Sequence, residues 1–210
     1  MTGKDAPPSL TLYPHAADFT NRPGPPEGGY SWGQIEEAIK TNTLHALRRT
    51  DKGQYEYEQW QAKIDLKNYN NVGEYIAFTI LGWPDLKDPA DKDVDPQSNW
   101  DPEERCKRIE PRLTLRINHY PFPVQESIQY FVLWSTRDMS VPQERERLDL
   151  YLRQQFEEHQ APDLLPPAHG KKKQWMWFVN PIELRSVATV HHLHVFVRDT
   201  GIAPQQRSEE

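Results

Sequence analysis

The sequence predicts an α+β fold, a single domain in which N-terminal helices pack on a mostly antiparallel sheet of about four strands. Two observations indicate this class. Apolar residues recur every three to four positions before Gly82, the period of helices, and they alternate with polar residues from Arg112 onward, the period of strands. A chain of 210 residues is long enough for one sizeable core, whereas a second independent core would be cramped.

The composition divides the chain into three segments. Residues 1–29 contain six prolines and little periodic hydrophobicity, so we expect a flexible N-terminal arm. Residues 30–199 are expected to form the α+β catalytic domain, and residues 200–210 a disordered tail. Within the domain, residues 85–104 carry eight acidic and two basic side chains, which predicts a long solvated loop.

Three helices are expected in the first half of the domain. Ser31 and Gln34 have the spacing of a capping box, which indicates the start of the first helix. Gly53 is expected to separate this helix from the second, in which large apolar residues recur at i, i+3 and i+7. The expected helices cover residues 31–49, 54–69 and 75–80.

The second half of the domain is expected to contain the sheet and one further helix. Apolar and polar residues alternate over 112–118, and residues 127–135 are apolar almost throughout, which predicts a strand in the middle of a sheet. Prolines end a charged amphipathic helix over 142–159. Strands over 174–179 and 189–198 complete one antiparallel sheet, with the helices expected against one of its faces.

The last strand carries the residues best suited to chemistry. An extended chain over 189–198 places the side chains of His192, His194 and Arg198 on one face and that of Leu193 on the other. Two imidazoles and a guanidinium on one face are able to bind an anion, transfer protons or hold a metal. The simpler alternative is a half-exposed strand whose polar face carries histidines by chance.

Metal and cofactor chemistry is not expected. A metal held by His192 and His194 needs a third ligand from elsewhere, such as His119 or a carboxylate. The chain contains no paired CxxC, no GxGxxG or GxxxxGK[ST] nucleotide loop, and no GxSxG nucleophile motif. The lone cysteine, Cys106, lies in a charged run and is a weak candidate for a nucleophile.

The segment His192-Leu193-His194-Val195-Phe196-Val197 partly resembles the histidine-triad motif of nucleotide hydrolases and transferases. In that motif three histidines alternate with apolar residues, and the middle histidine attacks a phosphorus. His192 and His194 match the first two histidines, and Phe196 stands at the third position. The resemblance implies, as one alternative, a degenerate nucleotide hydrolase or transferase in which His194 is the nucleophile.

A broader resemblance covers the chain from Gly29 to Arg198. In order, the chain contains GGYSWGQIEEAI, LxxLRR, YEQW, ILGW, INHYPFP, FVLWS, FVNP, an S-V pair and HxHV. This succession is similar to a mostly fungal family of unknown-function domain proteins that includes the arginine-containing cyclodipeptide synthases. Those enzymes take arginine from arginyl-tRNA and join it to a second amino acid as a diketopiperazine. Other members are known only as proteins linked to the amino-sugar response.

The resemblance implies a tRNA-dependent aminoacyl transferase of secondary metabolism, whose partners are arginyl-tRNA and a second amino acid. An aminoacyl ester is already activated, so the protein must orient two aminoacyl groups, deprotonate an amine and stabilise an oxyanion. The candidate catalytic residues are His192 and His194 as bases, Asn118 and Asn180 as oxyanion donors, and Ser186 or Ser135 as an acyl carrier.

The two substrates require two further sets of side chains. A guanidinium is bound by carboxylates and aromatic rings, and tRNA phosphates are bound by lysine and arginine. The candidate contacts of the amino acids are Glu126, Asp101, Glu103, Glu104, Tyr130, Trp134 and Arg198. The candidate contacts of tRNA are Arg48, Arg49, Arg105, Lys107, Arg108, Lys171, Lys172 and Lys173.

The sequence favours a cytoplasmic protein with no membrane partner. No apolar run approaches the roughly 20 residues of a membrane span, and the N-terminus lacks the basic and apolar regions of a signal peptide. A single cysteine cannot form an internal disulfide, which is consistent with a reducing compartment. A non-catalytic ligand-binding protein of the same fold is the remaining alternative, because fold does not determine activity.

Overall fold

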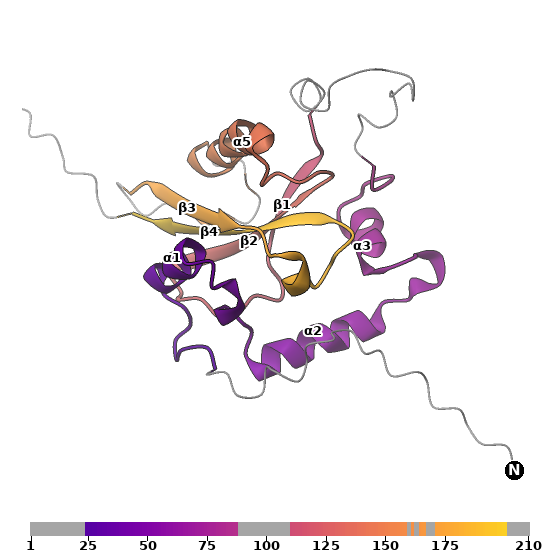
Figure 1. The fold of residues 1–210 in the computed structure, drawn as a ribbon, viewed down its shortest axis with the longest axis horizontal. Coiled ribbons are helices and arrows are strands. Elements are labelled where there is room, and N and C mark those ends of the chain that lie inside the picture. Colours follow the sequence, from indigo (N-terminus) through magenta and orange to yellow (C-terminus); the bar gives the residue numbers. More distant parts are fainter. Residues whose placement is uncertain (1–23, 88–109, 159–160, 162–163, 167–170, 201–210) are drawn as a thin grey trace, which may run out of the picture.

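Four antiparallel strands form the centre of an α+β fold. The structure is a computed structural model that describes residues 24–87, 110–158, 161, 164–166 and 171–200. Its strands are β1 (Leu113–Ile117), β2 (Ile128–Ser135), β3 (Lys173–Phe178) and β4 (His191–Asp199), in the order β1-β2-β4-β3 (Figure 1). The strand that is apolar almost throughout, β2, pairs with both β1 and β4 and lies inside the sheet, as predicted.

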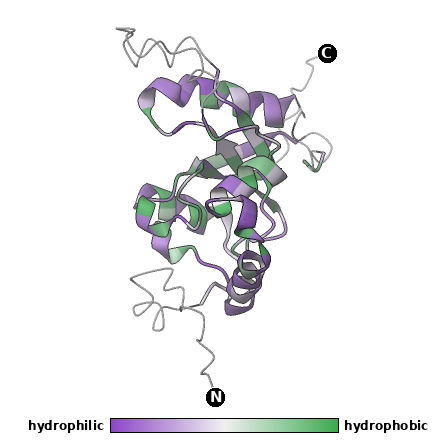
Figure 2. Cartoon of the chain, turned by 90° about the vertical axis from the view of Figure 1, so that its right-hand side faces the viewer, coloured by the Kyte–Doolittle hydropathy of each residue, from purple (hydrophilic) through white to green (hydrophobic). Residues whose placement is uncertain are grey.

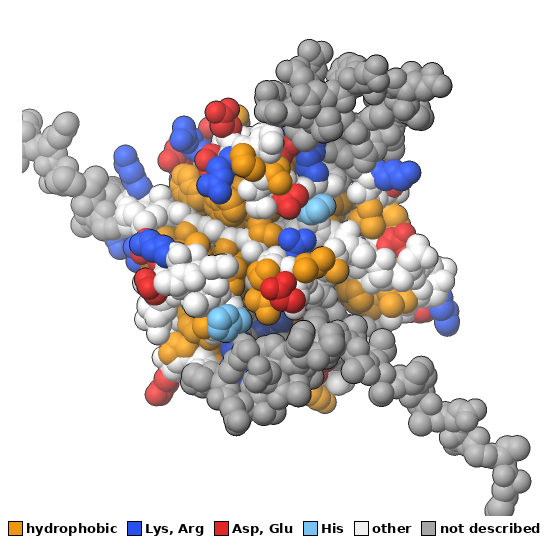
Figure 3. Space-filling model, viewed as in Figure 1, with side chains coloured by type: hydrophobic (Ala, Val, Ile, Leu, Met, Phe, Trp, Pro, Cys, Tyr) orange, Lys and Arg blue, Asp and Glu red, His pale blue; other side chains and the backbone are white. Residues whose placement is uncertain are grey.

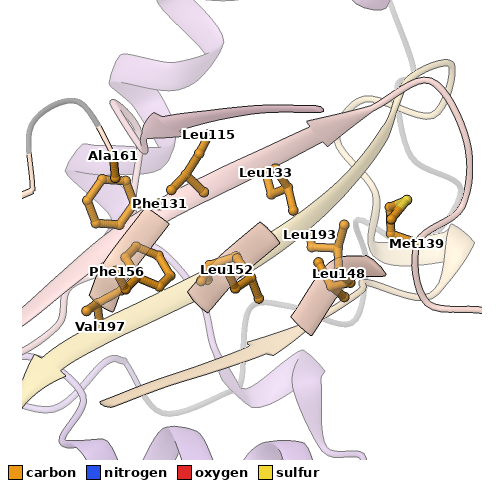
Figure 4. Close-up of a cluster of buried hydrophobic side chains, with 11 residues drawn as sticks. Leu115, Phe131, Leu133, Met139, Leu148, Leu152, Phe156, Ala161, Leu193 and Val197 are labelled. Carbon is orange, nitrogen blue, oxygen red and sulfur yellow. The ribbon is translucent and has the colours of Figure 1, made fainter. Parts of the chain in front are cut away.

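One face of the sheet, here called the α5 face, packs against α5 (Arg145–Glu157). This helix follows the short turn η6 (Pro142–Glu144). Leu193 and Val197 of β4 point to this face and pack with Phe156 of α5 in a fully buried cluster (Figure 4). The alternation predicted for the last strand is therefore confirmed, because its odd-numbered apolar residues are in this cluster.

The opposite face, here called the histidine face, packs against the N-terminal helices. One end of it is covered by α1 (Trp32–Lys40) and η2 (Leu44–Ala46), and the other end by α3 (Val72–Tyr75) and the π-helical turn η4 (Ile76–Ile80). Between them run α2 (Asp51–Lys63) and η3 (Leu66–Asn68), and η7 (Ile182–Leu184) precedes β4.

Helices therefore cover both faces of the sheet, and the expectation that they pack against one face is wrong. Figure 1 shows α5 on one side of the strands and the N-terminal helices on the other. The reason is the composition of the inner strand β2. Phe131 and Leu133 on the α5 face and Tyr130 and Val132 on the histidine face are all buried, and apolar surface on both faces requires cover on both.

The first helix starts as predicted but ends earlier. Ser31 accepts a hydrogen bond from the Gln34 backbone, and the Gln34 side chain accepts one from the Ser31 backbone, which completes the capping box. The helix ends at Lys40 instead of Arg49. Asn42 has a φ of 54°, a left-handed conformation that ends the helical repeat.

The second helix begins before the glycine that was expected to separate the helices. Thr50 is its N-cap, and the Thr50 hydroxyl accepts a hydrogen bond from the Gly53 backbone at 3.0 Å. Gly53 therefore lies in the first turn of α2, and its predicted role as a helix breaker is wrong. The cap three residues upstream outweighs the low helix propensity of one glycine.

Hydrophobic residues are concentrated in the strands, between helical layers that are more hydrophilic (Figure 2). Among the residues that the structure describes, no helix has the length and apolar character needed to cross a membrane.

Candidate functional site

A strip of polar side chains crosses the middle of the histidine face, between two buried apolar clusters. His192 and His194 of β4 are part of this strip, and they lie opposite Trp134 and Val132 of β2. One flanking cluster contains Phe196 and the residues of α1, and the other contains η4 together with the loop before β4. The side chains predicted to carry chemistry thus point toward the N-terminal layer, as strand alternation requires.

His194 is held by hydrogen bonds at both ring nitrogens. The amide Nδ2 of Asn180 lies 2.9 Å from Nε2, and the hydroxyl of Tyr130 lies 2.6 Å from Nδ1. An amide nitrogen donates, so Nε2 accepts and Nδ1 carries the hydrogen that it donates to Tyr130. With both nitrogens occupied, His194 is suited to position its neighbours and unsuited to take a proton from a substrate.

The surroundings of His194 keep its ring neutral. Burial lowers the pKa of His194 well below its ordinary range, and the nearby His192 and Arg49 lower it further. Burial also raises the pKa of the Tyr130 hydroxyl, against the opposing effects of the Arg49 charge and the Asn118 side chain. Both groups therefore stay uncharged at neutral pH, and the pair acts as a fixed polar element inside the fold.

His192 differs from His194 because one of its nitrogens is free. Its Nδ1 donates to the carbonyl of Val190 at 2.9 Å, and its side chain is 6% exposed. The other nitrogen, Nε2, makes no hydrogen bond with any residue that the structure describes. Burial lowers the pKa of His192, and the charge of Arg185 lowers it further, while the Val190 carbonyl opposes both. A neutral ring with Nδ1 protonated presents Nε2 as a base.

Two aromatic contacts fix the orientation of the His192 ring. The Trp134 ring lies beside it at a centroid distance of 5.1 Å and an interplanar angle of 39°. The His194 ring meets it edge-on at 5.6 Å. A base whose ring is held by a hydrogen bond and two ring contacts loses little entropy when it reacts.

Arg185 is a functional candidate that the sequence did not single out. Its Nε donates to the backbone carbonyl of Asn180 at 2.8 Å, so Asn180 joins Arg185 to His194. The charge of Arg185 is close enough to lower the pKa of both His191 and His192. Its terminal nitrogens have no hydrogen-bond or ion-pair partner among the described residues. A guanidinium beside a neutral base is suited to stabilising an anion.

Arg49, predicted to contact tRNA, is half-buried beside the site. Its Nε donates to the carbonyl of Tyr120 at 2.7 Å, and its guanidinium stacks on the Tyr57 ring at 4.3 Å. Its charge lowers the pKa of both Tyr130 and His194. Arg49 therefore contributes positive charge to the histidine site as well as contacts within the fold.

Several predicted substrate contacts are separated from the histidines. The ring of Tyr130 packs against Phe122 at 4.8 Å and Phe196 at 4.4 Å, which leaves no free ring face for a guanidinium. Arg198 stacks on Trp32 at 4.2 Å, six residues beyond His192 on the same strand. At about 3.3 Å per residue this is roughly 20 Å from His192.

Glu126 and the three lysines lie far from His192, whereas Ser186 lies near Arg185. Glu126 is exposed in the turn before β2. The adjoining end of β2 pairs with Arg198, so Glu126 is also remote from His192. Lys173 forms an ion pair with Asp199 at 2.9 Å, and Lys171 and Lys172 precede it at the same end of the sheet. Ser186 is half-buried in the loop between η7 and β4, directly after Arg185. These positions bring Ser186, but not Glu126 or the three lysines, near the site.

Asn118 and Asn180 are close to the histidines, although their side chains are already engaged. The Oδ1 of Asn118 accepts from the Tyr120 backbone at 3.0 Å, and Asn180 contacts His194. These contacts fix the position of both side chains, and the Asn180 amide keeps one further hydrogen that it can donate. Ser135 is 1% exposed and accepts from the Arg137 backbone at 3.1 Å, so it is not accessible as an acyl carrier.

Arg48 is half-buried, and its Nε has no hydrogen-bond partner in the described part of the chain.

Figure 3 shows basic, acidic and hydrophobic side chains interspersed over the visible face, with no large area of one charge. The described residues contain no group of three or more His, Cys, Asp or Glu that could hold a metal ion. Six predicted contacts lie outside the described residues: Asp101, Glu103, Glu104, Arg105, Lys107 and Arg108.

Comparison with known proteins gives several matches. The chain is 28% identical over 185 residues to the uncharacterized protein YPL067C of Saccharomyces cerevisiae, covering 80% of this chain and 79% of that protein. It is 23% identical over 194 residues to N-acetylglucosamine-induced protein 1 of Candida albicans, covering 90% and 74%. A solved structure titled "Crystal Structure of HTC1" matches with a TM-score of 0.50 and 25% identity, covering 81% of this chain and 85% of that one.

A family profile, described as protein of unknown function (DUF3605), matches residues 31–198. The matched region runs from the N-cap of α1 to the penultimate residue of β4, and so includes the whole sheet and the polar strip. The relatives in S. cerevisiae and C. albicans are fungal, as the resemblance of the sequence implied. Because the profile covers most of its length, the chain belongs to the DUF3605 family.

Proposed function

We propose that the chain is an arginine-containing cyclodipeptide synthase, which joins arginine from arginyl-tRNA to a second amino acid as a diketopiperazine. The proposal combines the resemblance of the sequence blocks with the chemistry of the polar strip. The observation that carries it is the hydrogen bond from His192 Nδ1 to the Val190 carbonyl, 2.9 Å long. This contact leaves Nε2 of a neutral imidazole available as a base.

A base of this kind meets the main requirement of the reaction. The α-ammonium group of one aminoacyl ester first releases a proton to solvent and becomes a nucleophilic amine. The amine attacks the carbonyl carbon of the other ester, so that a C–N bond forms and negative charge develops on the carbonyl oxygen, while His192 Nε2 takes the remaining excess proton from the nitrogen. The ester C–O bond breaks, and the departing ribose oxygen receives this proton from His192 and becomes a hydroxyl. A second cycle of the same kind closes the ring.

Arg185 supplies the positive charge for the oxyanion. Its Nε is anchored on the Asn180 carbonyl, its terminal nitrogens make no hydrogen bond with the described residues, and its charge also acts on the Asp138 carboxylate. The same arginine lowers the pKa of His192, which keeps the base unprotonated at neutral pH. His194 and Asn180 act as positioning residues, since their side chains bond to each other at 2.9 Å. Preorganised donors of this type contribute about 3–4 kcal/mol to acyl transfer in well-studied enzymes.

The nucleotide hydrolase alternative is less well supported by the same contacts. A histidine that attacks phosphorus needs a free ring nitrogen, whereas both nitrogens of His194 are engaged. The third position of the histidine triad is occupied by Phe196, which is fully buried against Tyr130 and Phe122.

The proposal is tested by mass spectrometry of reactions that contain purified protein, arginyl-tRNA and a pool of other aminoacyl-tRNAs. We expect an arginine diketopiperazine, and His192→Ala should lower its rate of formation by about 100-fold or more, the usual contribution of a general base.

His191→Ala is the matched control, because His191 is an exposed histidine of the same strand that points to the other face. It should leave the rate within about twofold. No arginine diketopiperazine from the wild-type protein, or an undiminished rate with His192→Ala, would refute the proposal.

A further inference from the structure

A shallow cavity of about 440 Å³ opens at the C-terminal end of α2, in the size range of small-molecule sites. No residue of the polar strip lines it, and none of its residues was singled out as a candidate contact. It is lined by Trp60, Lys63, Ile64, Asp65, Asn68, Tyr69 and Tyr75.

Three aromatic side chains form the fixed walls of this cavity. Tyr69 and Tyr75 meet edge-to-face at 5.4 Å, and the Tyr69 hydroxyl is hydrogen-bonded to Thr79 at 2.9 Å. Trp60 packs on the Tyr120 ring at 5.2 Å. Rings held in place in an open cavity are suited to stacking on a planar heterocycle, and a stack of this kind contributes about 1–3 kcal/mol per base.

The polar groups of the cavity match the other parts of a nucleotide. Lys63 is exposed and has no carboxylate partner among the described residues, so its ammonium is available to a phosphate. The Asp65 carboxylate accepts from the Lys67 backbone through one oxygen, and its second oxygen lies 3.8 Å from the Lys67 ammonium. An exposed carboxylate of this kind accepts hydrogen bonds from ribose hydroxyls. The Asn68 amide offers a donor and an acceptor to a base edge.

A ligand that engages both charged side chains has an anionic part and a hydroxyl-bearing part. A simple anion would be repelled by Asp65, and a cation by Lys63. A purely apolar ligand would engage neither. A ribonucleotide engages both side chains and the aromatic walls together, and its 2′-hydroxyl also distinguishes RNA from DNA.

The cavity and the candidate base are linked through one apolar cluster. Trp60 and Tyr75 pack on the apolar cluster that includes Trp134, and Trp134 lies against the His192 ring at 5.1 Å. The hydroxyl of Thr189, in the loop before β4, also donates to Asn71 at 2.8 Å, and Asn71 is the N-cap of α3. The segment that carries the cavity is thus fixed directly to the strand that carries the histidines.

We infer that this cavity binds a ribonucleotide in the single-stranded end of an RNA, with the base on the aromatic walls, the ribose at Asp65 and the phosphate at Lys63. The inference rests on the proposed function in one respect: the RNA is taken to be the acceptor end of the aminoacyl-tRNA that serves as substrate. It adds to that function a recognition site formed by α2, η3 and α3.

The inference is tested by fluorescence anisotropy with a labelled six-nucleotide single-stranded RNA, a DNA of the same sequence and unlabelled AMP as a competitor. The RNA should bind at least fivefold more tightly than the DNA, and AMP should compete with the RNA, because it contains the base, ribose and phosphate assigned to the cavity. Lys63→Gln should weaken RNA binding about fivefold or more, and the slope of log K against log salt should become shallower by about 0.7, the increment that one phosphate neutralised on a single strand contributes. Asp65→Asn, which keeps the acceptor for the Lys67 backbone, should remove most of the preference for RNA.

Lys52→Gln is the matched control, because Lys52 is an exposed lysine at the other end of α2. It should change the affinity less than twofold. Equal losses from Lys63→Gln and Lys52→Gln, equal binding of RNA and DNA, or failure of AMP to compete with the RNA would each overturn the inference.

The assay contains no aminoacyl ester, so it separates this inference from the proposed function. Diketopiperazine formation by a protein whose RNA affinity ignores Lys63 and Asp65 refutes the nucleotide site alone. RNA binding that depends on both residues, without any diketopiperazine, refutes the synthase and leaves the nucleotide site standing.

Discussion

His192 and Trp134 lie opposite each other on β4 and β2, with ring centroids 5.1 Å apart. The Nδ1 of His192 donates to the Val190 carbonyl, and its Nε2 is on the other side of the ring. The Trp134 ring packs against the apolar cluster formed by η4 and the loop before β4, and His192 belongs to the polar strip. A change in the charge of His192 therefore affects the polar strip and this cluster. Protonation would place an uncompensated cation in a buried region that already contains the charge of Arg185.

Folding stability should fall as the pH decreases below about 6.5, the ordinary pKa of histidine. Burial lowers the pKa of both His192 and His194, so below this pH the unfolded chain binds protons that the folded chain does not. The stability is fully present above pH 6.5 and decreases as the pH falls toward the lowered pKa values. Each histidine contributes a slope of up to about 1.4 kcal/mol per pH unit. Urea unfolding between pH 7.5 and 5 measures it.

The matched variants for this measurement are His194→Gln and His45→Gln. The first should reduce the slope, because it removes the histidine with the strongly lowered pKa. The second changes an exposed histidine on η2 and should leave the slope unchanged. A wild-type stability that is constant from pH 7.5 to 5 would contradict the buried neutral state of both rings.

The arrangement of the last strand could be predicted from sequence, but the roles of its two histidines could not. Alternation alone determines that His192 and His194 share a face, because successive side chains of a strand point in opposite directions. The free nitrogen of His192 depends on the Val190 carbonyl, and the engaged Nε2 of His194 depends on Asn180; both partners lie in irregular segments without a period. The contacts of Arg49, predicted only as a tRNA contact, could not be foreseen for a related reason. The acceptor that draws it inward, the Tyr120 carbonyl, is 71 residues away in the sequence.

Gly73→Ala should destabilise the protein by about 1–3 kcal/mol, the usual cost of overpacking. A Cβ at this position would lie 2.0 Å from the Thr189 hydroxyl and 3.1 Å from a methyl group of Val190, where α3 meets the loop before β4. Thermal or urea unfolding measures the effect. Gly33→Ala on α1 is the matched control, because its Cβ would meet nothing within 4 Å. It should be neutral or stabilising by up to about 1 kcal/mol, since alanine has the higher helix propensity.

The cause of the Gly73→Ala effect can be separated from any change in helix propensity. Adding Thr189→Ala to Gly73→Ala removes the closest clashing atom and should recover part of the stability. Strictly additive effects of the two substitutions would argue against a direct clash.

Glu144→Ala should cost about 3–5 kcal/mol, because it removes a fully buried carboxylate that forms ion pairs with two partly buried guanidinium groups. Glu144 is fully buried before α5, where Arg137 and Arg147 contact its two oxygens at 2.7 and 2.6 Å. These ion pairs fix the end of β2 to the start of α5. Glu146→Ala, an exposed substitution in the first turn of α5, should change stability by less than about 0.5 kcal/mol. A small effect of Glu144→Ala would mean that water replaces the carboxylate.

Tyr130→Phe should separate positioning from packing at His194. The ring of Tyr130 stays between Phe122 and Phe196, so the apolar cluster is preserved, while the 2.6 Å hydrogen bond to His194 Nδ1 is removed. The expected decrease in stability is about 1–2 kcal/mol, the cost of leaving a buried donor unsatisfied. Nitrogen NMR of the histidine rings should still find the His194 hydrogen on Nδ1, as in the wild type, because the Asn180 amide still donates to Nε2. Asn180→Ala removes this donor and should give a mixture of tautomers, because Nε2 is then free to carry the hydrogen. If Tyr130→Phe leaves the stability unchanged, the hydroxyl does not hold His194, and the positioning role assigned to this pair is wrong.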